Sequence, residues 1–325
     1  HELIERVFLK HLGNQTAESL EDASSISLAD AQGRLLGQPV MTTDSYVVQP
    51  IFFPGGDIGK LAVCGTVNDL AMRGATPLYL TAGFILEEGL PLDDLERVVA
   101  SMAATASAAG VRIVAGDTKV VGRGQADKLF INTAGIGLTP VGVNISAANA
   151  QPGDVALVSG AVGDHGLAIM TQREGLRFDS PLTSDCAPLN SLVRAILEAA
   201  PHIRTLRDPT RGGLATTLCE LAASSRVGIE IEESAVPVHE AVRAASELLG
   251  LDPFYAANEG KLIALAPQCE ADAALQAMRA HPLGREAAII GRVKAEHPGR
   301  VVARTLLGTR RLLDMLAGEP LPRIC

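Results

Sequence analysis

Four aspartates stand in settings that are typical of a cleft that binds phosphate and metal. Asp44 lies in the middle of the expected strand 40–48, Asp117 and Asp208 stand at or beside the ends of expected strands, and Asp69 lies on the first long expected helix. A single aspartate in such a place is more often a turn former or helix cap. Gathered in one cleft, however, carboxylates repel unless a cation lies between them, and Mg²⁺ binds a few carboxylates together with waters and substrate phosphates. The pattern therefore predicts that the four carboxylates converge on a magnesium site.

Two glycine-containing segments add groups that bind anions. In Asp208-Pro-Thr-Arg-Gly-Gly213, Arg211 can bind a phosphate, and the glycine pair opens an expected helix at Leu214. In Pro54-Gly-Gly-Asp-Ile-Gly-Lys60, glycine, a helix start and Lys60 lie together. The second segment is not a Walker A loop, because the spacing G-x-x-x-x-G-K-S/T is absent.

The segment from Gly318 to Cys325 carries a thiol on an extended arm. Pro320 and Pro322 exclude a helix, and eight extended residues reach about 26 Å. Arg323 lowers the pKa of a nearby thiol, whereas a terminal carboxylate raises it, so the sign of the net shift stays open. A frayed terminus is the ordinary interpretation of such a segment. Its lack of Ser/Gly padding and its Leu and Ile favour a segment that docks.

Three further segments have ordinary interpretations from local rules. Gly163-Asp-His-Gly166 is expected to be a helix start capped by Asp164, and not a catalytic Asp/His pair. Asn258-Glu-Gly-Lys261 is consistent with a turn that carries a solvated charge pair. Lys119 lies in an otherwise apolar run, and a buried lysine requires a partner.

Composition limits the class of protein and its partners. The chain has 325 residues, is 47% hydrophobic and contains no Trp, so the core must consist of Ala, Val, Leu and Ile. A net charge of −9 disfavours nucleic acid and anionic membranes as partners. No apolar run approaches the length of about 20 residues that a helix needs to span a bilayer. Five cysteines without C-x-x-C spacing indicate reduced thiols. The start at His1 shows no signal-peptide pattern and no initiator Met, so we expect a cytosolic protein whose true start precedes His1.

The elements that position these residues alternate between helix and strand, and the pattern begins afresh near residue 150. We therefore expect two α/β domains, at 1–150 and 151–307, followed by a tail at 308–325. One expected helix, 187–199, has Ser184 or Asp185 as its cap. The expected helices are 3–12, 58–73, 92–109, 165–174, 187–199, 214–224, 238–249 and 271–280. The expected strands are 40–48, 78–86, 111–115, 128–138, 155–159, 203–206, 229–231, 261–266, 287–293 and 300–306.

Taken together, eight segments resemble the HypE family of carbamoyl dehydratases, which act in NiFe-hydrogenase maturation and belong to the PurM-like ATP-dependent superfamily. The resemblance covers nearly the whole chain. The family's Gly-rich opening segment, His-Gly-x-Gly-Gly, is absent, and we expect weaker ATP binding without it. The eight segments are Phe52-Phe-Pro-Gly-Gly56, Ile58-Gly-Lys60, Gly83-Phe-Ile-Leu-Glu-Glu-Gly-Leu-Pro91, Gly116-Asp-Thr-Lys-Val-Val121, Asp127-Lys-Leu-Phe-Ile-Asn-Thr-Ala-Gly135, Gly163-Asp-His-Gly166, Ala257-Asn-Glu-Gly-Lys261 and Pro322-Arg-Ile-Cys325.

The resemblance implies a fold, a nucleotide site and an oligomeric state. The fold is α/β (α+β), with two PurM-like domains whose mixed sheets are flanked by helices, and an extended C-terminal tail. The N-terminal domain forms a homodimer through its strands. ATP and Mg²⁺ lie in the cleft between the domains, on Asp44, Lys60, Asp69, Asp117 and Asp208.

The resemblance also implies a reaction of hydro-lyase type. The thiol of Cys325 receives a carbamoyl group from the carbamoyltransferase HypF, and ATP phosphorylates the oxygen of that group. Loss of phosphate and of the nitrogen protons leaves a thiocyanate, whose nitrile passes to iron on the HypC–HypD complex. The resemblance assigns Glu259 as the base and Lys119 as its charged partner, and a carboxylate whose pKa is raised by burial suits this task.

Two other interpretations stay open at this point. One is a different PurM-like enzyme, such as a selenophosphate synthetase or a small-molecule kinase, neither of which needs a C-terminal cysteine. The other is a carrier that holds a group on Cys325 while its nucleotide site is structural. ATP turnover that depends on carbamoylated Cys325 distinguishes the three.

Overall fold

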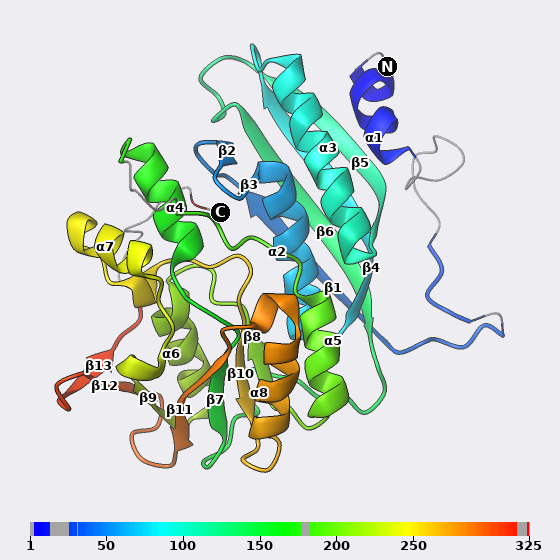
Figure 1. The fold of residues 1–325 in the computed structure, drawn as a ribbon. Coiled ribbons are helices and arrows are strands. Elements are labelled where there is room, and N and C mark those ends of the chain that lie inside the picture. The colour runs from blue at the N-terminus through cyan, green and yellow to red at the C-terminus, as the bar shows by residue number, and fades with distance from the viewer. Residues whose placement is uncertain (1–2, 14–25, 31, 177–181, 317–323, 325) are drawn as a thin grey trace.

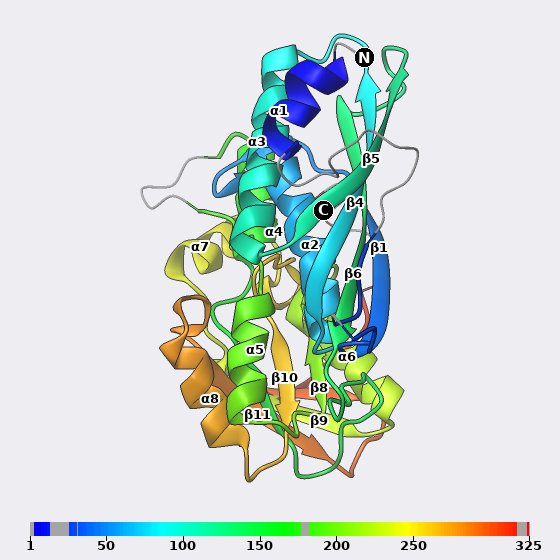
Figure 2. The same ribbon diagram turned by 90° about the vertical axis from the view of Figure 1, so that its right-hand side faces the viewer.

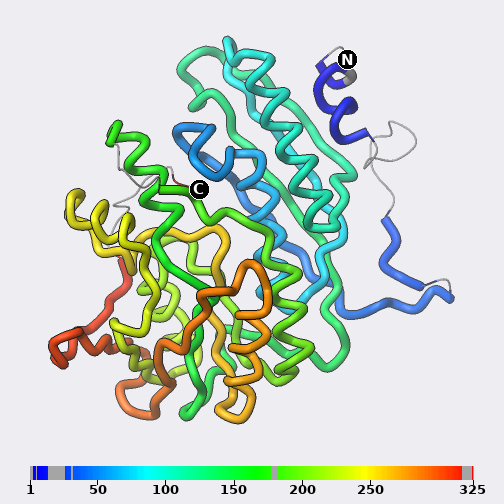
Figure 3. The backbone as a smooth tube through the Cα atoms, viewed as in Figure 1, coloured from blue at the N-terminus to red at the C-terminus, as the bar shows by residue number. Residues whose placement is uncertain are grey.

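The computed structural model describes residues 3–13, 26–30, 32–176, 182–316 and 324. These residues form the mixed α/β architecture that the sequence predicts, with a four-stranded sheet, a seven-stranded sheet and a short hairpin (Figure 1). The backbone runs from an N-terminal helix at one end of the molecule to the last strands at the other (Figure 3). Every helix of the described residues is too short or too polar to cross a bilayer.

The four-stranded sheet has the order β1-β6-β4-β5, with β4 and β5 parallel and the other neighbours antiparallel. Helices α2 and α3 pack on the same face of this sheet (Figure 2). The N-terminal helical segments pack against α3, and the β2–β3 hairpin precedes α2. The elements are η1 (Ile4–Leu9), α1 (Lys10–Leu12), β1 (Gln38–Tyr46), β2 (Phe52–Phe53), β3 (Gly56–Asp57), α2 (Ile58–Met72), β4 (Thr76–Glu87), α3 (Leu92–Ala109), β5 (Arg112–Val121) and β6 (Leu129–Thr139).

Helix α2 is the structural centre of this half because it is buried on nearly all sides. The Asp57 carboxylate caps it, accepting the amide protons of Gly59 at 2.8 Å and Lys60 at 3.2 Å. Gly74, with φ +68°, follows the end of the helix, as its position in the sequence predicts. A helix that is apolar all round requires packing on every face, and α2 contacts β1, β6, α3 and α5.

The opposite face of the four-stranded sheet is exposed and partly apolar. Side chains alternate along a strand, so the register places Met41, Ile85 and Lys119 on this face, away from α2 and α3. Met41 is 76% exposed and Ile85 is 41% exposed. An apolar sheet face open to solvent is a feature of interaction surfaces.

The seven-stranded sheet has the order β13-β12-β9-β11-β7-β10-β8 and forms the core of the second half. Helix α6 packs on one face, and α5 and α8 pack on the other (Figure 1). The elements are β7 (Val155–Val158), α4 (Asp164–Arg173), α5 (Asn190–Ala199), β8 (Thr205–Arg207), α6 (Gly213–Ser225), β9 (Gly228–Glu232), η2 (Glu233–Ala235), α7 (Glu240–Leu249), η3 (Pro253–Tyr255), β10 (Ile263–Ala266), α8 (Ala271–Ala280), η4 (Pro282–Gly284), β11 (Ala288–Lys294), β12 (Val301–Arg304) and β13 (Arg310–Leu313).

Three local expectations differ from the structure. Helix α5 begins at Asn190 and not at residue 187, because Ser184 and Asp185 bind other partners and do not cap it. Strand β13 lies within the segment expected to be tail, where it pairs with β12. Strand β5 continues to Val121, because β4 supplies a pairing partner along its whole length.

Candidate functional site

A cavity of about 460 Å³ lies where the two halves meet. Five parts of the chain line it: β1, α2, the loop from β8 into α6, the turn at Glu259, and the two residues Met315 and Leu316. Three of the four predicted aspartates, Asp44, Asp69 and Asp208, line this cavity. Arg211 and Glu259, also singled out from the sequence, line it as well.

The three carboxylates of the cavity influence one another electrostatically. Asp208 follows the end of β8 and is 8% exposed, and burial together with the charge of Asp69 raises its pKa to about 7. Burial also raises the pKa of Asp69, against the opposing effect of a 2.8 Å hydrogen bond donated by the Thr42 hydroxyl. The charge of Asp44 adds to both shifts. A cation in this cavity would relieve the repulsion among the three groups.

The start of α6 supplies the groups that can bind an anion. Gly212 is its N-cap with φ +73° and Gly213 is its first residue with φ +59°, so the glycine pair opens the helix, as predicted. Arg211 precedes the pair and lines the cavity. Thr216 lines the cavity too, and its hydroxyl oxygen is buried without a hydrogen-bond partner among the described residues. A helix N-terminus with an unpartnered hydroxyl suits a phosphate ligand.

Glu259 is buried at the inner wall of the cavity, and the expected solvated turn at residues 258–261 is wrong. Glu259 is 2% exposed and Asn258 is fully buried. Burial raises the pKa of Glu259 well above its usual range, and the charges of Cys186 and Asp208 add to this shift. Among the described residues, three buried side-chain oxygens have no hydrogen-bond partner, and two of them, Glu259 Oε1 and Thr216 Oγ1, belong to this cavity. Unsatisfied polar atoms of this kind mark a place where a ligand can bind.

The backbone around Glu259 is held rigidly by side chains from other segments. The Asp185 carboxylate accepts the amide protons of Glu259 at 3.0 Å and Gly260 at 3.2 Å, and Lys261 pairs with it at 3.4 Å. Asn68 of α2 donates to the Glu259 carbonyl at 3.4 Å. A side chain at position 260 would meet the Asp185 carbonyl at 1.8 Å, so only glycine fits there. The Glu259 side chain is therefore presented by a fixed turn.

The structure does not bring Asp117 and Lys119 to the cavity. They pair with each other at 3.0 Å on β5, and their side chains are 71% and 72% exposed, so the expected burial of Lys119 is wrong. Strands β1 and β5 are the two edges of their sheet, about 14 Å apart at the usual strand spacing. Both side chains also point to the open face, whereas Glu259 lies on the α2 side. Within one chain, Lys119 is therefore not the partner of Glu259.

Lys60 is also separate from the carboxylates. It lies in the first turn of α2, nine residues before Asp69, which is about 14 Å along the helix. Its ammonium group donates to the Gly55 carbonyl at 2.7 Å. Lys60 therefore lies at the far end of the helix from the cavity.

The cavity fits Mg²⁺ only in part. No group of three or more His, Cys, Asp or Glu side chains in the described ranges is arranged to hold a metal ion by itself. The pKa of Asp208 is about 7, so this carboxyl is only partly ionised at neutral pH, and Asp44 and Asp69 are the other two carboxylates of the cavity that can bind a cation. Mg²⁺ commonly takes one or two carboxylates and completes its shell with waters and substrate phosphates. The cavity therefore fits a magnesium ion that arrives with a nucleotide.

A second polar feature, which the sequence interpretation missed, lies behind Glu259. The expectation that Asp164 caps α4 is wrong, because Gly163 is the cap residue and Asp164 pairs with His239 at 2.8 Å. The next residue, His165, is fully buried. The His165 ring contacts Ser184 Oγ at 2.7 Å and the carbonyl of Ile324 at 2.9 Å. No sequence signal connects residues so far apart. Cys325 lies outside the described residues.

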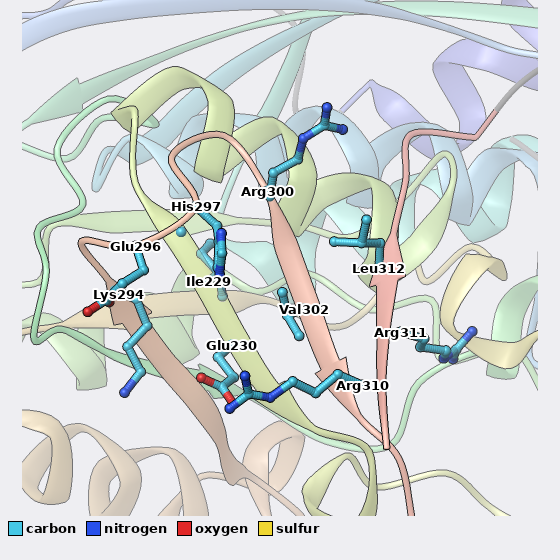
Figure 4. Close-up of a pocket in the computed structure, with 11 residues that line it drawn as sticks. Ile229, Glu230, Lys294, Glu296, His297, Arg300, Val302, Arg310, Arg311 and Leu312 are labelled. Atoms are coloured by element: carbon cyan, nitrogen blue, oxygen red, sulfur yellow. The ribbon is translucent and has the colours of Figure 1, made fainter. Parts of the chain in front are cut away.

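Another cavity, of about 390 Å³, lies on the outer face of the seven-stranded sheet (Figure 4). Its charged side chains come from β9, from β11 and the loop that follows it, and from β13, and Figure 4 shows Arg310 directed toward Glu230. These two side chains pair at 3.5 Å, and the Arg310 side chain is 69% exposed. Solvated ion pairs of this kind contribute little binding energy. The cavity with the buried carboxylates is therefore the better candidate site.

Comparison with known proteins agrees with this architecture. A family model for the N-terminal domain of AIR synthase related proteins matches residues 22–139, and the model for their C-terminal domain matches residues 151–304. These two matches define the class of protein. The chain is 55% identical to the carbamoyl dehydratase HypE of Azotobacter vinelandii over 324 residues, which is 100% of this chain and 93% of that protein.

Solved structures give the same result at the level of the fold. The hydrogenase maturation protein HypE in complex with ATP matches with a TM-score of 0.95 and 53% identity, over 100% of this chain and 96% of that one. A chain of a HypE–HypF complex matches with a TM-score of 0.82 and 52% identity, over 85% and 90% of the two chains. The chain belongs to the HypE family of carbamoyl dehydratases.

Proposed function

We propose that this chain uses ATP to dehydrate an S-carbamoyl group on Cys325 to a thiocyanate, which supplies cyanide ligands for the iron centre of a NiFe hydrogenase. The observation that carries the proposal is the buried carboxyl group of Glu259, whose Oε1 has no hydrogen-bond partner among the described residues, at the wall of a cavity lined by aspartates. Relatives that are named carbamoyl dehydratases, and one related HypE solved with ATP, support it.

The reaction needs a phosphate site, a proton acceptor and a mobile thiol. The carbamoyl oxygen attacks the γ-phosphorus of ATP and releases ADP, since an amide oxygen becomes a good leaving group only after phosphorylation. Phosphate then leaves with that oxygen while both nitrogen protons are removed, and a C≡N triple bond forms. We assign the start of α6 and Arg211 to the phosphates, Asp44, Asp69 and Asp208 to Mg²⁺, and Glu259 to the protons.

The raised pKa of Glu259 supports its role as the base. A carboxylate with a high pKa is a stronger proton acceptor once it is ionised. Within the part of the chain that the structure describes, its Oε1 has no hydrogen-bond partner, so this atom can bind a ligand in the cavity. Met315 and Leu316, at the root of the tail, line the same cavity. The segment that carries Cys325 therefore starts beside the proposed nucleotide site.

Three residues that lie away from the cavity would take part in the reaction only if assembly changed their surroundings: Lys60, Asp117 and Lys119. We propose that two copies pack through the open face of the four-stranded sheet, where Met41 and Ile85 are exposed. Such a homodimer would cover Asp117 and Lys119, which lie on the same face. Lys60, in the first turn of α2, would likewise reach the nucleotide only if its surroundings change.

The remaining parts of the proposal concern domains, partners and location. We propose a division near residue 150, which the two sheets and the two family models support. The proposed partners are HypF, as in the related HypE–HypF complex, and a HypC–HypD complex. A cytosolic location agrees with the four free cysteines of the described residues.

The proposal is tested by mass spectrometry of the C-terminal peptide. The protein is incubated with HypF, carbamoyl phosphate and ATP, and the peptide that ends at Cys325 is analysed over time. We expect a carbamoyl adduct that then loses the mass of one water. In Glu259→Gln, which keeps the shape of the side chain but accepts no proton, the adduct should form normally and its dehydration should slow by about 10²-fold or more.

The outcomes separate the proposal from its two alternatives. ATP hydrolysis without any dependence on carbamoylated Cys325 would indicate a different PurM-like enzyme. A carbamoyl adduct that persists in the parent protein while ATP is bound would indicate a carrier. Either result overturns the assignment of dehydratase activity to this chain.

A further inference from the structure

The described structure places Ile324 in a socket formed by residues of both halves of the molecule. Its side chain is 4% exposed and belongs to the same buried cluster as Phe53, Ile169 and Cys186. Its carbonyl oxygen accepts a hydrogen bond of 2.9 Å from Nε2 of His165. The side chain and the backbone of this one residue are therefore both bound.

The hydrogen bonds determine which nitrogen of His165 carries the proton. A carbonyl oxygen has no proton to donate, so Nε2 of the ring must be the donor to Ile324. Burial lowers the pKa of His165, so the ring is neutral and Nδ1 must be an acceptor. The Ser184 hydroxyl donates to Nδ1 at 2.7 Å, and it accepts the Cys186 amide proton at 3.1 Å. The chain of hydrogen bonds orients a single donor toward the tail.

The socket is rigid because its parts are bound to one another. The Phe53 ring packs edge to face on His165 with 5.5 Å between the ring centroids, and Figure 1 shows α4 close to the β2 segment that carries Phe53. The Ser184 amide donates to the Pro54 carbonyl at 2.8 Å. His165 and Ser184 therefore cannot move independently of the β2–β3 hairpin.

The socket is also connected to the turn that carries Glu259. The Gly163 amide donates to Asn258 Oδ1 at 2.7 Å, and the Gly166 amide donates to the Ala257 carbonyl at 3.0 Å. These bonds lie on either side of His165 and end on the two residues before Glu259. The turn that carries Glu259, the proposed base, therefore also holds the segment of His165, which binds Ile324.

We propose that His165, oriented by Ser184, is a positioning residue that holds the backbone of Ile324 and so sets where the Cys325 thiol lies during the reaction. The proposal rests on the function proposed above, in which Cys325 carries the reacting group. A donor to a backbone carbonyl and an apolar socket for a β-branched side chain fix the register of the tail. Isoleucine suits this role because it has few rotamers to lose on docking.

The test measures how well Cys325 is protected from a thiol reagent. Iodoacetamide labelling is followed by mass spectrometry in a Cys269→Ser background, because Cys269 is exposed whereas Cys64, Cys186 and Cys219 are buried. His165→Leu removes the donor, and we expect labelling of Cys325 to accelerate by about tenfold. His165→Gln keeps a donor near the position of Nε2, and it should restore most of the protection.

Two further variants keep the test decisive if His165→Leu is unstable. Ile324→Ala empties the socket while His165 stays in place, and it should also accelerate labelling. His202→Leu is the matched control, because His202 is exposed and pairs with Glu270 on the surface. This control should label at the parental rate. Circular dichroism verifies that each variant is folded.

We call the contact of His165 with Ile324 the latch. The outcomes for the latch and for the dehydratase activity are independent, because labelling needs neither HypF nor ATP. Parental labelling of both His165→Leu and Ile324→Ala overturns the latch, as does a His165→Gln variant that labels as fast as His165→Leu. If the latch holds, carbamoyl transfer from HypF to His165→Leu should persist while its dehydration slows. Failure of the parent to form thiocyanate would overturn the proposed function and leave the labelling result unchanged.

Discussion

Replacing Asp208 with asparagine should stabilise the ligand-free protein at neutral pH, even though Asp208 is a proposed ligand of Mg²⁺. The pKa of this carboxyl rises from its ordinary 3.8 to about 7, because it is buried beside Asp69 and Asp44. A rise of about three units, at about 1.4 kcal/mol for each, corresponds to about 4 kcal/mol. This value is the upper limit of the cost of ionising Asp208 in the folded protein.

The sign of the pH dependence follows from proton binding. The folded protein holds the Asp208 proton more tightly than the unfolded chain does, so its stability falls as pH rises from about 4 to about 7. Below this window the carboxyl is protonated in both states and adds no penalty. Above it the carboxyl is ionised in both states and the full penalty applies. The Asp208→Asn variant lacks this titration, so its advantage over the parent should grow across the window.

The assay is urea unfolding at a series of pH values, followed by circular dichroism because the chain has no Trp. Burying an amide instead of a carboxyl changes the free energy of unfolding by an amount that does not depend on pH. The diagnostic quantity is therefore how the difference in unfolding free energy between Asp208→Asn and the parent changes with pH. Asp117→Asn is the matched control, because that carboxylate is exposed and its pKa is lowered by Lys119. This control should show no such gain. A constant difference between Asp208→Asn and the parent across the window would refute the reasoning.

Three other predictions concern activity and assembly. Asp69→Asn should slow ATP hydrolysis strongly with an unchanged circular dichroism spectrum, and parental hydrolysis would make Asp69 a structural residue. Met41→Glu should convert a dimer to a monomer in sedimentation velocity, because like charges would face each other across a symmetric interface; a parent that is already monomeric at micromolar concentration contradicts the proposed dimer. Cys325→Ala should abolish thiocyanate formation but keep ATP binding by calorimetry, and any thiocyanate formed by this variant would place the reaction on another group.

The sequence by itself determined the local structure around much of the site. Helices Leu92–Ala109 and Ala271–Ala280 have the bounds that their periodicity predicts, since helix periodicity and stop signals are short-range properties. For the same reason the glycine pair after Arg211 opens α6, and Asp208 follows a strand. The mixed α/β fold also follows from alternating helix and strand patterns.

The tertiary structure alone decided which of these residues meet. Lys119 is exposed and separate from Glu259 because β5 pairs with β4 along its length and side chains alternate between the two faces of the sheet. The spacing of residues along the chain cannot show whether Lys119 lies near Glu259, because their separation depends on the register of four paired strands.

Burial and long-range contact were likewise outside the reach of the sequence. Residues 258–261 have the composition of a solvated turn, yet packing against α2 and Asp185 buries Glu259 and raises its pKa. His165 looks like part of a helix start, yet it binds the carbonyl of Ile324, 159 residues further along the chain. A hydrogen bond to a backbone carbonyl requires no particular residue type at its partner, so it leaves no pattern in the sequence. Only the folded chain brings the two together.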